Sequence, residues 1–381
     1  MGYTNQRVIL IVSLILIFLG IVMVYSSSYV YAQYKFNREP YYFLLRQLIW
    51  VALSLSVMIF LTQLDYQRLG EVSKWMLLVC GILLVLVLIP GIGIMVKGAR
   101  RWLGYGHLRF QPSELAKIVL IIFMAKFLSQ KYDSMKDFRR VVLPSIAILA
   151  LFMILIVKEP DFGNAMIIGL IMGIMWFVAG MRIRLIIASL IVSAPIVTYL
   201  IFSKQYRLDR ILAFLNPWDY RSGKGWQLVQ SLISLGSGGI GGRGLGQSVQ
   251  KYLYLPDSHS DFIFSILGEE LGFLGTSAVV LLFLILIWCG IKVSLRIKDL
   301  FGSYLAIGIT SLIGIQALIN MCVVTGLLPT KGLPLPFISY GGSSLLANCI
   351  GIGILINIAS YDTSTKRPKI KAKIIKKAYS T

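Results

Sequence analysis

Long, nearly uninterrupted apolar runs recur along the whole chain, and they limit its fold more than any other feature. About 20 apolar residues are enough to cross the hydrocarbon core of a bilayer as one helix. Backbone groups in lipid must be satisfied inside the segment, so such runs form helices rather than irregular structure. We expect ten spanning helices, at 7–25, 44–63, 73–90, 114–130, 141–157, 162–180, 183–202, 262–291, 301–325 and 341–360.

The charge content agrees with a membrane protein. Only 14% of the 381 residues are charged, whereas a soluble domain carries about 25%. The first run has no small-residue cleavage site after it, so we interpret it as a retained helix and not as a signal peptide. The sequence therefore predicts an all-α integral membrane protein, a polytopic bundle of ten helices that forms a single domain over 1–365.

Basic residues predict the orientation of the bundle. The tail at 366–381 has seven Lys or Arg within 366–377, and the segment 126–140 has five. Cytoplasmic segments are enriched in such residues, so both termini are expected in the cytoplasm, with a large extracytoplasmic loop at 203–261 between spans seven and eight. The segment 97–117 is basic on the disfavoured outer side, which favours a functional role there.

The net charge of +21 is compatible with attraction to anionic lipid or to an anionic substrate. Nucleic acid is not an expected partner, because the basic residues are scattered between the spans and form no single basic domain. The four cysteines, and the acidic residues and histidines, lack metal-ligand spacing. We expect buried thiols and no disulfide framework.

Four of the 16 acidic residues lie within YLYLPDSHSDFIFSILGEELGFLG at 252–275. Asp261 directly precedes an apolar run, where it would either cap the helix or act as a general base whose pKa is raised by partial desolvation. Glu269 and Glu270 lie about 12 Å deeper along the helix. We expect them to pair with basic or polar groups inside the bundle, with a proton path as the alternative.

Three further segments carry candidate chemistry. In KGARRWLGYGHLRFQPSELAK, at 97–117, the arginines suit phosphate oxygens, and Glu114 and Lys117 share one helix face; an interfacial belt with a local ion pair is the alternative. In VKEPDFGNA, Glu159 and Asp161 fill a short junction that is equally typical of a charged turn. The loop LPTKGLPLPFISYGGSSLL, at 328–346, combines prolines, glycines and hydroxyls in a pattern that favours an anion pocket.

The stretch GIGGRG at 239–244 formally matches G-x-G-x-x-G. No strand precedes it and no parallel β-α-β unit surrounds it, so we reject a nucleotide site. We expect a flexible loop whose backbone approaches another segment closely.

Together these motifs resemble the SEDS family (shape, elongation, division and sporulation), and within it the FtsW-like division branch most closely. A SpoVE-like sporulation paralogue would look almost the same. The resemblance runs from the first span to the tenth, on the motifs GARRWLGYGHLRFQPSELAK, KEPDFGNA, NPWDYRSGKGWQLVQSLISLGSGGIGGRGLG, QKYLYLPDSHSDFIFSILGEELG and LPTKGLPLPFISYGGSSL.

The resemblance implies a peptidoglycan glycosyltransferase that polymerises lipid II on the outer face of the bacterial cytoplasmic membrane, at the division septum. The essential acid of the family falls on Asp261, which would remove the proton of a sugar 4-hydroxyl while pyrophosphate leaves with inversion. Glu269 and Glu270 would be struts or would tune its pKa. The residues expected to contact the substrate are Arg101, Trp102, Glu114, Lys117, Glu159, Asp161, Arg207, Arg210, His259, Lys331, Ser339, Ser343 and Ser344.

The family also implies a class B penicillin-binding protein as partner, along with other divisome proteins. A divalent cation, Mg²⁺ or Mn²⁺, would suit the pyrophosphate, although no sequence feature requires one. The alternatives are a lipid II flippase, a rod-elongation or sporulation polymerase of the same family, and a scaffold. The short, plain inner loops argue against a flippase, which needs access from both leaflets.

Overall fold

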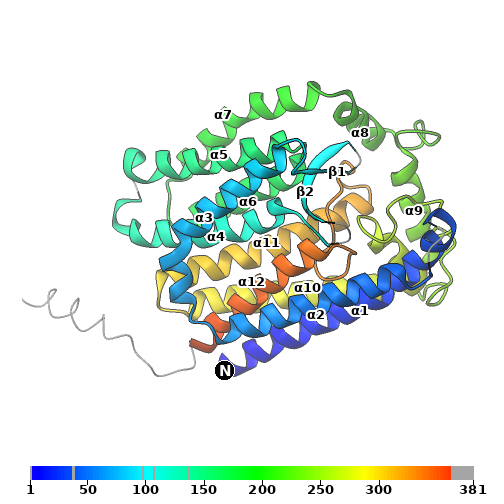
Figure 1. The fold of residues 1–381 in the computed structure, drawn as a ribbon, viewed down its shortest axis with the longest axis horizontal. Coiled ribbons are helices and arrows are strands. Elements are labelled where there is room, and N and C mark those ends of the chain that lie inside the picture. The colour runs from blue at the N-terminus through cyan, green and yellow to red at the C-terminus, as the bar shows by residue number, and fades with distance from the viewer. Residues whose placement is uncertain (1, 37–38, 97, 106–107, 136, 362–381) are drawn as a thin grey trace, which may run out of the picture.

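The structure is a computed structural model that describes residues 2–36, 39–96, 98–105, 108–135 and 137–361. It is a bundle of long helices, with a small sheet and two short helices gathered at one end (Figure 1). The predicted basic tail at 366–381 lies outside the described residues.

Each predicted span coincides with one helix. The helices are α1 (Gly2–Phe36), α2 (Tyr42–Gln63), α3 (Tyr66–Leu88), α4 (Pro112–Gln130), α5 (Leu143–Lys158), α6 (Phe162–Val178), α7 (Ile183–Phe202), α10 (Ile263–Arg296), α11 (Leu300–Val324) and α12 (Gly342–Tyr361). In the described part of the chain, eight helices are long and apolar enough to cross a membrane. Of the other two, α6 has only 17 residues, and α4 carries Glu114, Lys117 and Lys126.

The structure departs from the all-α prediction in the basic segment before α4. Three strands, β1 (Ile94–Val96), β2 (Ala99–Tyr105) and β3 (Leu108–Phe110), form an antiparallel sheet in the order β1-β2-β3. Ile94 pairs with Trp102, and Leu103 with Phe110. β1 and β3 have three residues each, and the β2 sequence ARRWLGY does not alternate between apolar and polar residues, which is why no strand was predicted here.

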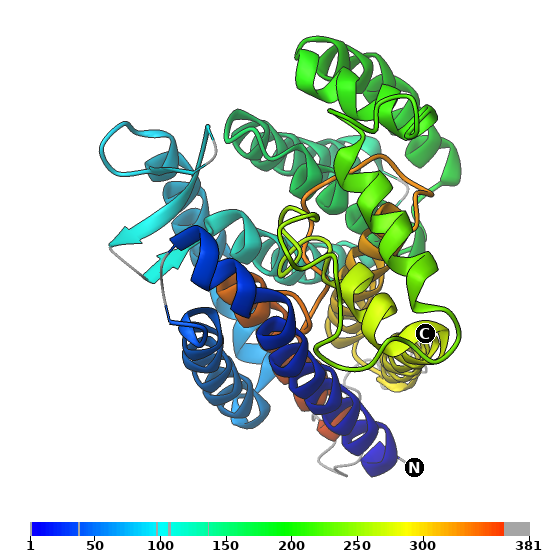
Figure 2. The same ribbon diagram turned by 90° about the vertical axis from the view of Figure 1, so that its right-hand side faces the viewer.

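The long predicted loop at 203–261 is also partly helical. It contains α8 (Gln205–Leu215) and α9 (Trp226–Gly238), and both lie at the end of the bundle that carries the sheet (Figure 1). We call this end the sheet end, and Figure 2 looks onto it. At the opposite end, a short 3-10 turn (Tyr132–Ser134) and a π-helical turn (Phe138–Val142) connect α4 to α5.

Burial differs sharply between helices. α12 packs against α1, α2, α4 and α11 and is buried along most of its length. Within the described residues, α7 contacts only α6 and α8 among the principal helix pairs, and no described residue in its most apolar window is buried. The bundle therefore has α12 and α11 near its core and α7 at its edge (Figure 1).

The glycine-rich stretch after α9 packs directly on α10. A Cβ atom at Gly238 would lie 2.0 Å from the carbonyl oxygen of Gly268, and one at Gly242 would lie 2.2 Å from that of Glu270. α10 is broken here, since Gly272 has φ +66°. The predicted close backbone approach is confirmed, and the partner is the interrupted helix itself.

Candidate active site

Two loops meet at the sheet end and hold each other in place. One precedes α10 and contains His259, Ser260 and Asp261; the other precedes α12 and contains Lys331 to Tyr340. Ser339 Oγ donates to the Ser260 carbonyl at 2.6 Å, and the Tyr340 amide donates to the His259 carbonyl at 3.0 Å. His259 and Ser339 therefore serve the packing of these loops, whatever else they contact.

Asp261 is half-buried at the junction of these loops. The N-cap position of α10 is Phe262, so Asp261 directly precedes the N-cap and does not cap the helix, contrary to one of the two alternatives from the sequence. A Cβ atom on Gly332 would lie 2.7 Å from Asp261 Oδ2. The missing side chain at Gly332 thus makes room for the carboxylate.

Three predicted cations gather beside this junction. The Lys331 Nζ lies 4.9 Å from the centroid of the Phe162 ring, and the Arg207 guanidinium lies 5.5 Å from the same ring. Arg210 Nη1 donates to the Thr330 carbonyl at 3.3 Å. Within the described residues none of the three forms an ion pair with a carboxylate.

Lys331 is the cation closest in sequence to Gly332. Burial, followed by the neighbouring Arg210 charge, lowers the pKa of Lys331 to about 8. A desolvated ammonium next to like charge gains from any anion that binds there. The cluster formed by Arg207, Arg210 and Lys331 is therefore suited to hold an anionic group next to Asp261.

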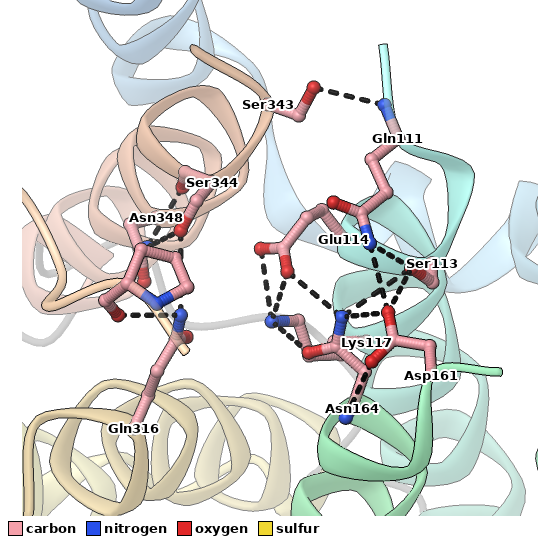
Figure 3. Close-up of polar contacts among 11 residues, drawn as sticks. Gln111, Ser113, Glu114, Lys117, Asp161, Asn164, Gln316, Ser343, Ser344 and Asn348 are labelled. Carbon is pink, nitrogen blue, oxygen red and sulfur yellow. Dashed lines mark hydrogen bonds and ion pairs between the residues drawn. The ribbon is translucent and has the colours of Figure 1, made fainter. Parts of the chain in front are cut away.

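Glu114, Lys117, Asp161 and Asn164 form a buried polar network between α4 and α6 (Figure 3). Lys117 Nζ lies 2.9 Å from Glu114 Oε1 and 3.1 Å from Asn164 Oδ1. Asn164 Nδ2 donates to Asp161 Oδ2 at 2.9 Å and to Glu114 Oε1 at 3.1 Å. The predicted substrate contacts Glu114, Lys117 and Asp161 are thus bonded to one another, directly or through Asn164.

The predicted serines of the last loop lie on the other side of this network. The Gln111 amide donates to Ser343 Oγ at 3.0 Å, which links α12 to the start of α4. Gln316 Nε2 lies 3.4 Å from Ser344 Oγ, and Asn348 Nδ2 donates to the Ser344 carbonyl at 2.8 Å. Figure 3 shows Glu114 on the side of its network that faces Ser344 and Gln316.

Arg101 and Glu159 meet through the backbone. Arg101, on β2, donates through Nε to the Glu159 carbonyl at 3.0 Å and through Nη2 to the Pro160 carbonyl. These carbonyls follow the C-terminus of α5, where a cation complements the helix dipole. Trp102, the next residue on β2, is partly exposed.

The Glu159 carboxyl is fully buried, and neither of its oxygens has a hydrogen-bond partner in the described part of the chain. Burial, together with the nearby Asp161 charge, raises its pKa to about 8, and Arg101 opposes this shift. The group is therefore neutral at pH 7. Its predicted contact with substrate stays a prediction.

Glu269 and Glu270 are both buried and each is paired. Ser248 Oγ donates to Glu269 Oε2 at 2.6 Å, and Arg243 Nη1 lies 3.4 Å from Glu269 Oε1. Ser26 Oγ lies 2.6 Å from Glu270 Oε1, and Lys251 Nζ lies 3.4 Å from the same atom. We call these groups the paired-glutamate site; they join α1, α10 and the loop after α9.

Three residues of the junction were not selected from the sequence: Phe162, Gly332 and Asn320. Asn320 Nδ2 donates to the Asp261 carbonyl at 2.9 Å and to the Leu333 carbonyl at 2.6 Å. For Asn320, the signal in the sequence was an amide side chain inside an apolar run. The sequence alone does not place this amide near Asp261.

The described residues do not fit a metal held by the protein alone. They contain no group of three or more His, Cys, Asp or Glu side chains that could hold a metal ion. The carboxylates of Glu114 and Asp161 are already occupied by Lys117, Gln111 and Asn164. The cysteines are free thiols, and Cys80, Cys289 and Cys349 are buried, as expected from the sequence.

Comparison with known proteins gives the family. The sequence model of the family that groups FtsW, RodA and SpoVE, described as "Cell cycle protein", matches residues 6–364. The chain belongs to this SEDS family. "Probable peptidoglycan glycosyltransferase FtsW" of Geobacter sulfurreducens is 46% identical over 353 residues, which cover 93% of this chain and 94% of that protein. "Stage V sporulation protein E" of Bacillus subtilis is 43% identical and covers 93% and 96%.

Solved structures of the family share the fold. A chain of a peptidoglycan synthase complex that coordinates polymerization and crosslinking superposes with TM-score 0.74 at 26% identity, covering 93% of this chain and 97% of that one. The rod shape determining protein RodA of Thermus thermophilus gives TM-score 0.68 at 25% identity, with the same coverage. This SEDS protein is therefore a multi-pass membrane protein, in agreement with its apolar helices.

Proposed function

We propose that the protein polymerises lipid II into glycan strands on the outer face of the cytoplasmic membrane. The observation that carries the proposal is the junction at the sheet end. There, the Asp261 carboxylate lies against Gly332, and the preceding residue, Lys331, contacts the same Phe162 ring as Arg207. A candidate base thus lies beside a cluster of cations that form no ion pair within the described residues.

The chemistry requires this combination. A carboxylate at Asp261 accepts the proton of the 4-hydroxyl of the incoming lipid II as its oxygen attacks the anomeric carbon of the growing glycan. The bond between that carbon and the pyrophosphate breaks, and the configuration inverts. Arg207, Arg210 and Lys331 stabilise the charge that develops on the leaving pyrophosphate. No step is assigned to a metal ion.

The buried polar network has a supporting part in this proposal. Glu114 and Lys117 are almost completely buried, and removing one partner of such a pair leaves an uncompensated charge inside the bundle. The network and its link to Ser343 hold α4, α6 and α12 in register around the junction. Direct contact of Lys117, Asp161 or Trp102 with the substrate remains part of the proposal.

The proposal includes a membrane topology. Ten spans, with both termini in the cytoplasm, put the sheet, α8, α9 and the junction on the outer side, where lipid II is polymerised. The positive-inside rule supports this orientation. The lipid chains would then lie along the helices, with the sugars at the membrane surface.

A class B penicillin-binding protein is the proposed partner, because a solved structure similar to this chain is part of a peptidoglycan synthase complex. The similarity to FtsW relatives supports a role in septal wall synthesis with the divisome. The sporulation role is the alternative within the family, supported by the similarity to the stage V sporulation protein.

Polymerisation of labelled lipid II by the purified protein, alone and with its cognate penicillin-binding protein, tests the proposal. We expect a ladder of labelled glycan strands, which are not extracted into organic solvent as lipid II is. A flippase would give no polymer but would move labelled lipid II between the leaflets of a vesicle. Lipid transfer without polymer, from a sample shown to be folded, would replace the proposal with the flippase.

A further inference from the structure

Two amide side chains lie one helical turn apart on the face of α11 that meets the junction. Gln316 and Asn320 are 0% and 1% exposed. Residues four apart share a helix face, so the two amides can reach neighbouring points of one segment. Gln316 Nε2 donates to the Pro334 carbonyl at 3.3 Å, and Asn320 Nδ2 donates to the Leu333 carbonyl at 2.6 Å.

Asn320 makes one bond that Gln316 does not. Its Nδ2 also donates to the Asp261 carbonyl at 2.9 Å. A side-chain amide carries two N–H groups, so a single Asn can satisfy both carbonyls at once. Its Oδ1 has no hydrogen-bond partner among the described residues, and the flipped amide would place this oxygen against two carbonyl oxygens. The two donated bonds therefore define the orientation of the side chain.

The two carbonyls belong to the two halves of the junction. The Asp261 carbonyl lies on the loop that carries the proposed base, and Leu333 follows Gly332, the residue against which the Asp261 carboxylate lies. Lys331 precedes Gly332. The geometry points to Asn320 as a positioning residue that sets the distance between Asp261 and Lys331. This inference rests on the proposed function, since it concerns the placement of its base and its cation.

The effect on the reaction follows from this arrangement. A displacement of about 1 Å between reacting groups can lower a rate by about 10²-fold. Asn320→Asp keeps the shape of the side chain but removes both donated bonds, and Asn320→Leu removes them with an apolar group of similar size. We expect kcat for lipid II polymerisation to fall by about 10²-fold in both variants, with little change in KM, because Asn320 bonds to backbone and acts through Asp261.

The matched control is Gln316→Leu. It removes a donor from the same helix face and the same loop but leaves the bond to Asp261 in place, so we expect a loss of less than 10-fold. The pH profile is the second readout. The acid limb of the pH profile of kcat/KM reports the pKa of the base. This limb should shift along the pH axis in the Asn320 variants and keep its position in Gln316→Leu.

The experiment measures initial rates against lipid II concentration for the full chain in complex with its penicillin-binding protein. The inference would be overturned if kcat fell equally in the Asn320 and Gln316 variants and the acid limb of kcat/KM kept its position in all of them. Should neither Asn320 variant fold, Gly332→Ala tests the same geometry from the other loop, since its Cβ would displace Asp261 Oδ2. An unchanged kcat in Gly332→Ala would overturn the inference as well. Full activity of Asp261→Asn would instead refute the proposed base, which separates failure of the proposed function from failure of the inference.

Discussion

The stretch from 252 to 275 contains two acidic sites that differ in burial and in the groups that surround them. At the paired-glutamate site, Glu269 and Glu270 are buried and surrounded by hydroxyl, amide and cationic donors. Asp261 is half-buried, and the cations near it have no carboxylate partner within the described residues. Saturated buried carboxylates hold elements together, whereas cations that have no carboxylate partner in the described part of the chain are typical of a site that binds an anion.

The largest effect that would separate the two sites is on stability. Glu270→Ala leaves the buried Lys251 without its carboxylate, and breaking a buried pair costs about 3–5 kcal/mol. We expect a large fall in the unfolding temperature of the purified protein. Lys251→Met added to Glu270→Ala should restore part of it.

The control for this change is Arg140→Ala, which breaks an exposed pair with Asp137 and should have little effect. A Glu270→Ala protein of normal stability that no longer polymerises lipid II would contradict the comparison. Glu270 would then belong with the residues that take part in the reaction.

The next effect is on the reaction and not on the fold. Lys331→Met removes a cation from the proposed pyrophosphate site, and loss of one such stabilising group costs about 10²–10³ in kcat. Because the pKa of Lys331 is about 8, its charge is lost as the pH rises through 8. The alkaline limb of kcat/KM is therefore expected near pH 8.

Lys331→Arg tests this assignment of the limb. Arginine keeps its charge at all accessible pH values, so the limb should move upward even if the maximal rate falls. An alkaline limb that stays near pH 8 in Lys331→Arg would exclude Lys331 as its source.

The smallest effect concerns Glu159, which resembles neither site, since it is buried and has no hydrogen-bond partner among the described residues. Its pKa is raised to about 8, so the folded state holds a proton that the unfolded state loses above about 4.5. The folded state therefore loses stability as the pH rises toward 8. Glu159→Gln removes this penalty and should raise the unfolding temperature at pH 9 by roughly 2–4 °C for each kcal/mol of penalty removed, with little change at pH 4. Equal unfolding temperatures of wild type and variant at pH 9 would show that the carboxyl is solvated or paired.

The long helices could be predicted from the sequence. Crossing the hydrocarbon core takes about 20 mostly apolar residues, and runs of that length are visible in a single sequence. The prediction missed the three-stranded sheet, because β1 and β3 are too short to show alternation and β2 has no alternating pattern. It also grouped Glu114, Lys117, Glu159 and Asp161 with the substrate contacts. Residue type and location on one side of the membrane favour such a role. The bonds that pair Glu114, Lys117 and Asp161 with neighbours depend on packing between α4 and α6, which the sequence does not display. Gly332 and Asn320 were missed for the same reason, since their importance lies in what they touch.

The most direct test of the central claim compares Asp261→Asn with Asp257→Asn. Both substitutions remove one carboxylate from the same loop, four residues apart, and asparagine tolerates the positive φ of Asp257. Each protein, complexed with its penicillin-binding protein and shown to be folded, is incubated with labelled lipid II. The account predicts polymer from wild type and Asp257→Asn and none above background from Asp261→Asn. Normal polymerisation by Asp261→Asn would contradict it.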